Sequence, residues 1–399
     1  MPIYRLENVI QPYAWGSRTV IARLLGLSSP SDTPQAEMWM GIHPKGPSLA
    51  VADGVRISLK QLIDQRPVEI LGTDVANRFE NVLPYLFKVL AAAHPLSIQA
   101  HPNKKQAEAG FLAEEEDGVP RDAPNRNYRD ANHKPEIICA LTPFWALNGF
   151  RSPDAAAELI EPVCPASLQK ALEQLKNQPD GLKSFFTATM TLSTAQCERA
   201  AEEVRTKAAP LADASPVYRW MKALSDAYPA DMGVLSPALL NLICLDPGQA
   251  MYLPAGQLHA YLDGIGIELM ANSDNVLRGG LTSKHVNIEQ LLQVVRFETT
   301  RIDVLHATVV KAGESIYRCP ASEFVLGVIH VRPNRPYRSV PKRSVEILLC
   351  TSGNGRIEED KERSLDVKKG ESFLVPACLA SYCVTGDLTM YKAAVPLSN

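Results

Sequence analysis

DPGQAMYLPAGQLHAY, residues 246–261, is the stretch that decides the fold class. Its apolar runs are short and are divided by glycine and proline, which is typical of β-strands joined by tight turns. A similar phrase, KKGESFLVPACLASY, occupies residues 368–382. The two phrases together predict two related β units. Because the second phrase has Ser381 where the first has His259, we expect metal chemistry in the first unit alone.

The same pattern of short apolar runs extends over most of the chain. Residues 1–151 and 246–298 contain it, and we predict that they form one β domain in two parts. Residues 299–399 contain it again, with turn signals such as TSGNG and KKGES, and predict a second compact β domain of sandwich or barrel type. The fold class is therefore predicted to be mainly β.

Residues 152–245 have a different composition, rich in Ala, Leu, Glu, Gln and Lys. Ser152 before Pro153 is typical of a helix N-cap followed by the first helical residue. Ser193 and Gln196 have the spacing of a capping box. We predict an all-helical insertion between the two parts of the first β domain.

Composition and charge exclude several classes of protein. The net charge is −3, and no stretch holds five like charges, so we expect no binding to nucleic acid or to an anionic membrane. No apolar segment reaches 18 residues, and Arg5 and Glu7 interrupt the N-terminus, which argues against a membrane span and a secretory signal. The eight cysteines form no Cys-x-x-Cys pair, which favours buried thiols in the cytoplasm.

PLSIQAHP, residues 95–102, carries the first group of candidate site residues. Alternation along a strand would place Ser97, Gln99 and His101 on one face and apolar side chains on the other. Three polar groups cost about 1–3 kcal/mol each if they are buried without partners. The alternative is a half-exposed strand with a polar outer face, and this segment alone favours that alternative.

NHKPE, residues 132–136, carries the second group. Pro135 disfavours a helical conformation at Lys134, so His133, Lys134 and Glu136 are predicted on an extended segment that leads into the buried strand EIICAL. The alternative is a polar turn that merely precedes a strand.

The third group lies in HAYLDGIGIELMANSDNVLRGGLTSK, residues 259–284. Alternation places His259 and Tyr261 on one strand face, and Glu268 falls inside an apolar run, where an unpaired carboxylate is costly. Asp274 and Arg278 follow, with two glycines that permit close approach of a ligand. A lone histidine in such surroundings is usually a satisfied core residue, but this combination is less often so.

Gln99, His101, Glu136 and His259 could together hold one divalent metal through two imidazole nitrogens and two oxygens. With no thiolate and one anionic ligand, such a site suits Lewis-acid chemistry better than a purely structural role. An amide ligand is unusual, and composition does not by itself select Gln99.

YRDANHKPE (128–136) and the segment 259–284 resemble the two signature segments of the type I mannose-6-phosphate isomerase family. QPYAWGS (11–17), AEMWMGIHPKGPS (36–48) and LFKVLAAAHPLSIQAHPNKK (86–105) are similar to the N-terminal part of the same family. The resemblance covers most of residues 1–290. It implies a pair of cupin-like (jelly-roll) β domains with a helical domain, and an enzyme that interconverts mannose 6-phosphate and fructose 6-phosphate through a cis-enediol or enediolate.

The resemblance also implies roles for single residues. It implies one Zn²⁺ per chain on Gln99, His101, Glu136 and His259, and Arg278 as a catalytic residue. Other positions match the lining of the family's substrate cleft: Lys88, Ser97, His133, Lys134, Glu268 and Asp274. The chain departs from the second signature at Gly279 and Ser283, where the family has Ala and Pro.

The chemistry of the reaction suggests which of these residues bind the phosphate and which transfer the proton. Lys88 and Ser97 are our candidates for the phosphate, because a cation and a hydroxyl suit its oxygens. Proton transfer could fall to Lys134, Asp274, Glu268, His133 or a zinc-bound water, and we favour the first two. We expect a monomeric cytoplasmic enzyme acting on a small sugar phosphate.

Two rival functions remain open at this point. One is an iron-dependent oxygenase with His101, His259 and Glu136 as its ligands. The other is a non-catalytic protein that binds a sugar phosphate.

Overall fold

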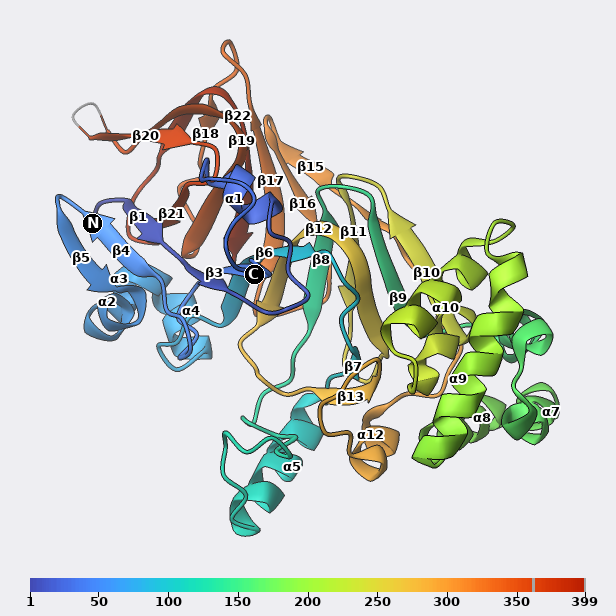
Figure 1. Ribbon diagram of the computed structural model, residues 1–399. Helices are drawn as coiled ribbons and strands as arrows, with labels where there is room; N and C mark the ends of the chain where they lie inside the picture. Colours follow the sequence, from blue (N-terminus) through green and yellow to red (C-terminus); the bar gives the residue numbers. More distant parts are fainter. Residues whose placement is uncertain (361–362, 398–399) are drawn as a thin grey trace.

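The computed structural model describes residues 1–360 and 363–397 and consists mainly of two large antiparallel sheets with helices beside them (Figure 1). The predicted mainly β class is confirmed. No helix in the described part of the chain has the length and apolarity that crossing a bilayer would require.

Sheet I contains β11 and β12, the strands to which residues 246–261 contribute. Its strands run in the order β14-β11-β8-β12-β6-β3-β2, with β7, β9, β10 and β13 attached beside this path. Its strands are β2 (Val9–Gln11), β3 (Glu37–Met40), β6 (Tyr85–Ala92), β7 (Ile98–Ala100), β8 (Glu136–Ala140), β9 (Phe144–Phe150), β10 (Leu240–Leu245), β11 (Gln249–Leu253), β12 (His259–Ala271), β13 (Leu277–Gly280) and β14 (Leu305–His306).

Sheet II contains most of the C-terminal strands, in the order β15-β16-β17-β22-β19-β21-β1-β4-β5, with β18 on β22 and β20 on β19. Its strands are β1 (Tyr4–Glu7), β4 (Leu49–Ala52), β5 (Val55–Ser58), β15 (Thr308–Lys311), β16 (Glu314–Tyr317), β17 (Val325–Val331), β18 (Tyr337–Arg338), β19 (Glu346–Glu358), β20 (Ser364–Lys368), β21 (Ser372–Val375) and β22 (Cys383–Ala394).

The N-terminus of the chain belongs to sheet II. Strand β1 pairs with β21, with Tyr4 opposite Leu374, and β4 and β5 continue the sheet outward from β1. The domain limits drawn from sequence, which keep residues 1–151 together, stay a prediction. Side chains of both sheets share one core cluster, for example Phe87 and Ile267 of sheet I with Ile347 of sheet II, so the two units pack directly together.

Helices lie mostly outside the sheets, and those from α6 to α11 follow one another between β9 and β10 at one side of the molecule (Figure 1). Ser152 caps α6 by accepting a hydrogen bond from the Ala155 backbone, and Ser193 with Gln196 forms a capping box at α9, as the sequence predicted. The helices are α1 (Val20–Leu24), α2 (Leu59–Gln65), α3 (Pro67–Leu71), α4 (Thr73–Arg78), α5 (Lys104–Glu116), α6 (Pro153–Ile160), α7 (Gln169–Asn177), α8 (Gly181–Met190), α9 (Thr194–Ala208), α10 (Pro216–Ala227), α11 (Ser236–Leu239) and α12 (Ile288–Val294), with short 3₁₀ turns at Glu161–Val163, Ala166–Leu168, Ala209–Leu211 and Met232–Leu235.

Strand β12 connects the two halves of sheet I by changing partners at Gly264. Before this residue β12 pairs with β7 and β9, and from it onward β12 pairs with β6 and β8. Gly264 has a φ of +124°, and a Cβ there would lie 2.7 Å from the carbonyl oxygen of Pro143. A glycine is therefore required where the strand crosses over. The crossover places His259 opposite Gln99 and Glu268 opposite Lys88.

The interior of sheet II contains a buried charged group of its own, which we call the Lys392 cluster: Glu314, Tyr337, Glu346, Tyr382 and Lys392. Lys392 Nζ forms ion pairs with Glu314 and, at 3.2 Å, with Glu346. The Tyr337 hydroxyl donates to Glu314 at 2.8 Å, and the Tyr382 hydroxyl donates to Glu346 at 2.9 Å. Each carboxylate thus has a cation and a hydroxyl as partners within the protein.

Candidate active site and metal centre

His101, Glu136 and His259 meet in the interior of sheet I, although they come from three distant segments. One ligand atom from each lies within 4.8 Å of the others. The Nε2 atoms of His101 and His259 lie 3.4 and 3.3 Å from the two Glu136 oxygens, and all three residues are buried. The predicted convergence of these residues is confirmed.

Both imidazoles are oriented by backbone carbonyls. His101 Nδ1 lies 2.7 Å from the Asn275 carbonyl oxygen, and His259 Nδ1 lies 3.0 Å from that of Gln257. A carbonyl can only accept, so each Nδ1 carries a proton, and each Nε2 is turned toward Glu136. Both Nε2 atoms and one Glu136 oxygen are buried and have no hydrogen-bond partner among the residues that the structure describes.

This pattern fits a divalent metal ion. Buried polar atoms without partners are rare, because each costs free energy, and a metal would satisfy all three at once. Burial and the Lys134 ammonium lower the pKa of His101 to about 4, so its imidazole is neutral at pH 7. Burial opposes ionisation of Glu136, but Lys134 and His101 hold the pKa of this carboxyl well below its usual value. A neutral His101 imidazole and an ionised Glu136 carboxylate are the protonation states that metal ligation needs.

Gln99 lies next to this group in the sheet. In the strand register it is opposite both His259 of β12 and Arg278 of β13, and its side chain lines the adjoining cavity. Ile98 and Ala100, which flank it, are buried, as the predicted alternation requires. Its role as a metal ligand stays a prediction.

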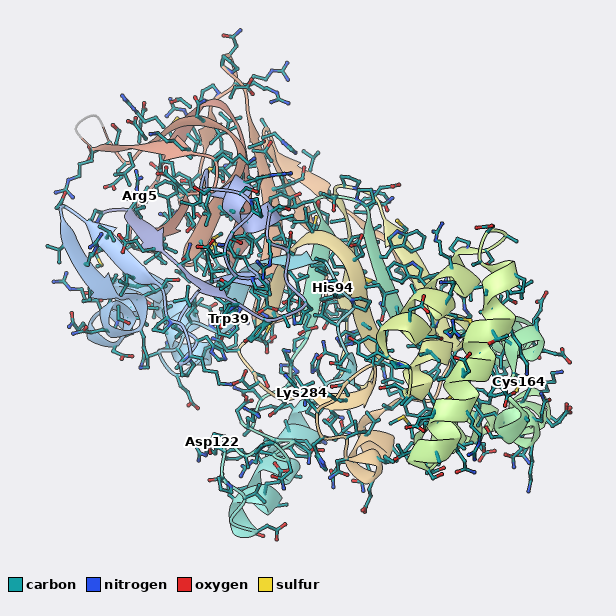
Figure 2. The ribbon with its side chains drawn as sticks, in the orientation of Figure 1. Arg5, Trp39, His94, Asp122, Cys164 and Lys284 are labelled. Carbon is teal, nitrogen blue, oxygen red and sulfur yellow. The ribbon has the colours of Figure 1, made fainter. Side chains whose placement is uncertain are left out.

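A cavity of about 640 Å³ opens beside the three ligands, which is large enough for a small sugar phosphate. Figure 2 labels three residues of its wall, Trp39, His94 and Lys284, which come from separate segments and lie near the middle of the molecule. The residues predicted from sequence that line this cavity are Lys88, Ser97, Gln99, Lys134, Glu136, Glu268, Asp274 and Arg278.

Lys88 and Glu268 form a buried ion pair in the cavity wall. Lys88 Nζ lies 2.8 Å from Glu268 Oε2 and 3.7 Å from Glu37 Oε1, and Trp39 Nε1 donates to the other Glu37 oxygen at 2.6 Å. Burial opposes the charge of Lys88, but Glu268 and Glu37 raise its pKa above the usual value. Lys88 is therefore a firmly charged residue whose charge is already balanced by carboxylates.

Asp274 also has partners inside the protein. Lys45 Nζ donates to it at 2.8 Å, and His43 Nε2 lies 3.2 Å from its other oxygen. Burial opposes ionisation, but His43 and Lys45 hold the pKa of Asp274 well below its usual value. Asp274 is thus a firmly ionised carboxylate and a weak base.

Arg278 and Lys284 are the cations of this cavity that the described part of the chain leaves without a hydrogen-bond partner for their charged groups. Burial and the neighbouring Arg129 lower the pKa of Arg278. Burial, Arg278, Arg129 and Lys45 lower the pKa of Lys284. Several cations therefore lie close together here, and neither Arg278 nor Lys284 has an ion-pair partner among the described residues.

The structure separates His133 from the other predicted site residues. Its imidazole lines a second cavity of about 550 Å³, and its Nε2 lies 2.7 Å from Glu323 Oε1. Lys134, the next residue, faces the metal-side cavity, where its Nζ lies 3.0 Å from Glu136 Oε1. The two residues thus point to opposite sides of the NHKPE segment.

Sequence reasoning did not select Glu37, Lys45 or Lys284. Glu37 could have been found, because a carboxylate inside the apolar run AEMWM carries the same signal as Glu268 in IGIELMA. Lys45 and Lys284 lie in polar loops, where a lysine is ordinary, and no local pattern marks them.

Comparison with known proteins gives a consistent result. Residues 3–153 match the family model for the catalytic domain of type I phosphomannose isomerase. The chain is 40% identical to the mannose-6-phosphate isomerase of Salmonella typhimurium, over 94% of each chain, and 33% identical to that of Homo sapiens, over 88% of each. A solved zinc-bound mannose 6-phosphate isomerase superposes with a TM-score of 0.90 at 36% identity, covering 99% of this chain and 100% of that one.

Proposed function

Because the chain belongs to the type I phosphomannose isomerase family, we propose that its cavity interconverts mannose 6-phosphate and fructose 6-phosphate with one bound zinc ion. The observation that carries this proposal is the set of three buried ligand atoms without protein partners, on His101, His259 and Glu136, beside a cavity of substrate size. His101, Glu136 and His259 would hold the zinc, with Gln99 as the fourth ligand. When bound, zinc supplies a Lewis acid that polarises substrate oxygens.

The arrangement of sheets and helices also supports the proposed isomerase function. We propose that each of the two sheets belongs to a cupin-like unit and that helices α6–α11 form a separate helical domain. The repeated phrase supports this, because β11 and β21 both begin just after a glycine with positive φ, Gly248 at +87° and Gly370 at +89°.

The phosphate is assigned to the positive end of the cavity. Lys88 was our candidate from sequence, but its ammonium is balanced by Glu268 and Glu37. Lys284 has no such partner among the described residues, and a phosphate dianion would compensate the cations around it. Arg278 lies opposite Gln99 in the sheet and lines the same cavity as Lys284, and it can stabilise negative charge that develops on the sugar oxygens.

Proton transfer between C2 and C1 requires a group near the metal end. Lys134 Nζ faces the cavity and lies 3.0 Å from Glu136, a metal ligand in this proposal, so it can reach the reacting carbons of a bound sugar. Asp274 is held by Lys45 and His43 and is a weaker candidate for the base. Glu268 is balanced by Lys88, although burial raises its pKa.

Neither rival function has support, because the relatives and the solved structures are isomerases of one kind. We also propose that the enzyme is a cytoplasmic monomer. All eight cysteines are free, which is compatible with a reducing compartment.

The test is a coupled assay of mannose 6-phosphate conversion before and after treatment with a chelator, followed by addition of zinc. We expect loss of activity on chelation and recovery with one zinc per chain. Full activity in protein shown to be free of metal would contradict the proposal.

A further inference from the structure

Asn275 lies on the segment that carries Asp274 and Arg278, but on its opposite face. Along residues 273–278 buried and half-buried positions alternate, and Asp274, Val276 and Arg278 line the cavity. Asn275 points inward and is fully buried, at 0% exposure. An amide at a core position of an extended segment is costly unless its hydrogen bonds are made.

The Asn275 side chain makes its hydrogen bonds to the backbone just before NHKPE. Its Oδ1 accepts from the backbone N–H groups of Arg129 and Asp130, at 2.7 and 3.2 Å. Its Nδ2 donates to the carbonyl oxygens of Asp130 and Asn132, at 2.7 and 2.9 Å. One side chain therefore fixes four backbone groups of the segment that leads to Lys134 and Glu136.

The Asn275 backbone contacts a metal ligand. Its carbonyl oxygen accepts the Nδ1–H of His101 at 2.7 Å, which orients that imidazole and leaves Nε2 unprotonated. Neighbouring bonds reinforce the link, because the Asp274 N–H donates to Asp130 Oδ2 at 2.7 Å and the Ser273 hydroxyl donates to the Asn132 carbonyl at 3.2 Å.

We propose that Asn275 is a positioning residue that couples His101 to the segment bearing Glu136. Its carbonyl sets the ring of one zinc ligand, while its side chain fixes the approach to another, so the two ligands keep their mutual placement only while the amide is present. This inference rests on the proposed function, because it assigns Asn275 to the assembly of that metal site. Removing the side chain releases the 129–132 backbone and allows the 275 carbonyl to shift.

The experiment measures zinc affinity of Asn275→Ala, using zinc alone in competition with a chromophoric chelator added to metal-free protein. We expect the dissociation constant to rise about 10- to 100-fold, the usual cost of losing a group that orients a metal ligand. The control is Asn241→Ala. Asn241 donates to the carbonyls of Asn148, Gly149, Phe150 and Thr300 at 3.1, 3.1, 3.2 and 3.1 Å, so its loss also removes a multiply bonded amide.

The control separates loss of stability from loss of ligand placement. We expect both variants to lower the unfolding midpoint, but only Asn275→Ala to weaken zinc binding. A second variant, Asn275→Asp, keeps an acceptor for the N–H groups of Arg129 and Asp130 but loses the donor to the Asp130 and Asn132 carbonyls, and its zinc affinity should fall between wild type and Asn275→Ala. It also serves as the test if Asn275→Ala does not fold.

Equal zinc affinity in wild type and the Asn275 variants, or an equal loss in Asn241→Ala, would overturn the assignment of Asn275. Failure of the wild-type protein to bind zinc would instead contradict the proposed function. The two failures are therefore distinguishable in one set of titrations.

Discussion

The interiors of sheet I and sheet II differ in how completely the chain satisfies the polar atoms of their buried charged groups. Each holds buried carboxylates that require a positive charge. In the Lys392 cluster the chain supplies that charge, because Lys392 lies between Glu314 and Glu346. In sheet I, Lys134 lies 3.0 Å from one oxygen of Glu136, but the other oxygen and the Nε2 atoms of His101 and His259 have no hydrogen-bond partner among the described residues.

The difference shows two states of a buried charged group: in sheet II the chain supplies every partner, and in sheet I three ligand atoms stay open for a metal ion. The Lys392 ammonium and the two tyrosine hydroxyls together provide partners for both carboxylates. No ligand atom of the Lys392 cluster is left free, so this cluster has a structural role. The sequence marks the difference at a single aligned position, where Ser381 replaces His259, and Ser381 is exposed between β21 and β22. A buried charged cluster thus indicates a metal site only when its atoms are left unsatisfied.

The largest expected effect comes from removing one of the proposed metal ligands of sheet I. His259→Ala, or His101→Ala, should remove bound zinc and activity together, with a loss beyond the roughly 10²- to 10³-fold that follows removal of one stabilising donor. Metal analysis and the coupled assay on the same sample check this. The matched control is Ser381→Ala at the aligned position of sheet II, which should change neither. A zinc-free His259→Ala protein with full activity would rule out the site.

The next largest effect comes from removing the ammonium of the Lys392 cluster in sheet II. Lys392→Met leaves Glu314 and Glu346 buried without their nearest cation, since Lys311 and Arg343 lie 3.9 and 4.0 Å from them, and should destabilise the zinc-loaded protein by about 3–5 kcal/mol in denaturant unfolding. Burial opposes the charge of Lys392, but Glu346 and Glu314 raise its pKa, so the ammonium stabilises the fold throughout the neutral range.

A triple variant tests the cause of that loss. Lys392→Met with Glu314→Gln and Glu346→Gln removes the charges together, and it should recover much of the stability because no carboxylate is left unpaired. Zinc content should stay normal in both variants. If Lys392→Met unfolds no more easily than wild type, the Lys392 cluster does not hold sheet II together.

Local patterns in the sequence predicted much of this arrangement. Alternation in PLSIQAHP and the proline in NHKPE predicted extended segments at Gln99 and Glu136, although each pattern alone favoured a polar strand face or a polar turn, and capping signals located two helix starts. Family resemblance was needed to select the ligand set, because Gln99 has no distinguishing local signal.

What the sequence could not predict depends on contacts between distant strands. Lys88 is a lone cation in LFKVL until β3 and β12 bring Glu37 and Glu268 beside it. His133 and Lys134 are adjacent, but the path of the backbone sends one toward Glu323 and the other toward Glu136. The pairing of β1 with β21 is also invisible locally, since the two segments lie at opposite ends of the chain.

The smallest effect distinguishes a cation that faces the cavity, Arg278, from a cation that stabilises the fold, Arg343. Arg278→Ala should lower turnover by about 10²- to 10³-fold with normal zinc content, because it removes a charge that stabilises the reacting oxygens. Burial lowers the pKa of Arg278, so its charge opposes folding at neutral pH, and its loss should not reduce the unfolding midpoint. Arg343→Ala should show the converse, because Arg343 donates to the Pro376 carbonyl at 2.9 Å in sheet II: lower stability with unchanged turnover. Unchanged turnover in Arg278→Ala would make Arg278 part of the scaffold, and the functional distinction between the two interiors would then rest on the metal ligands alone.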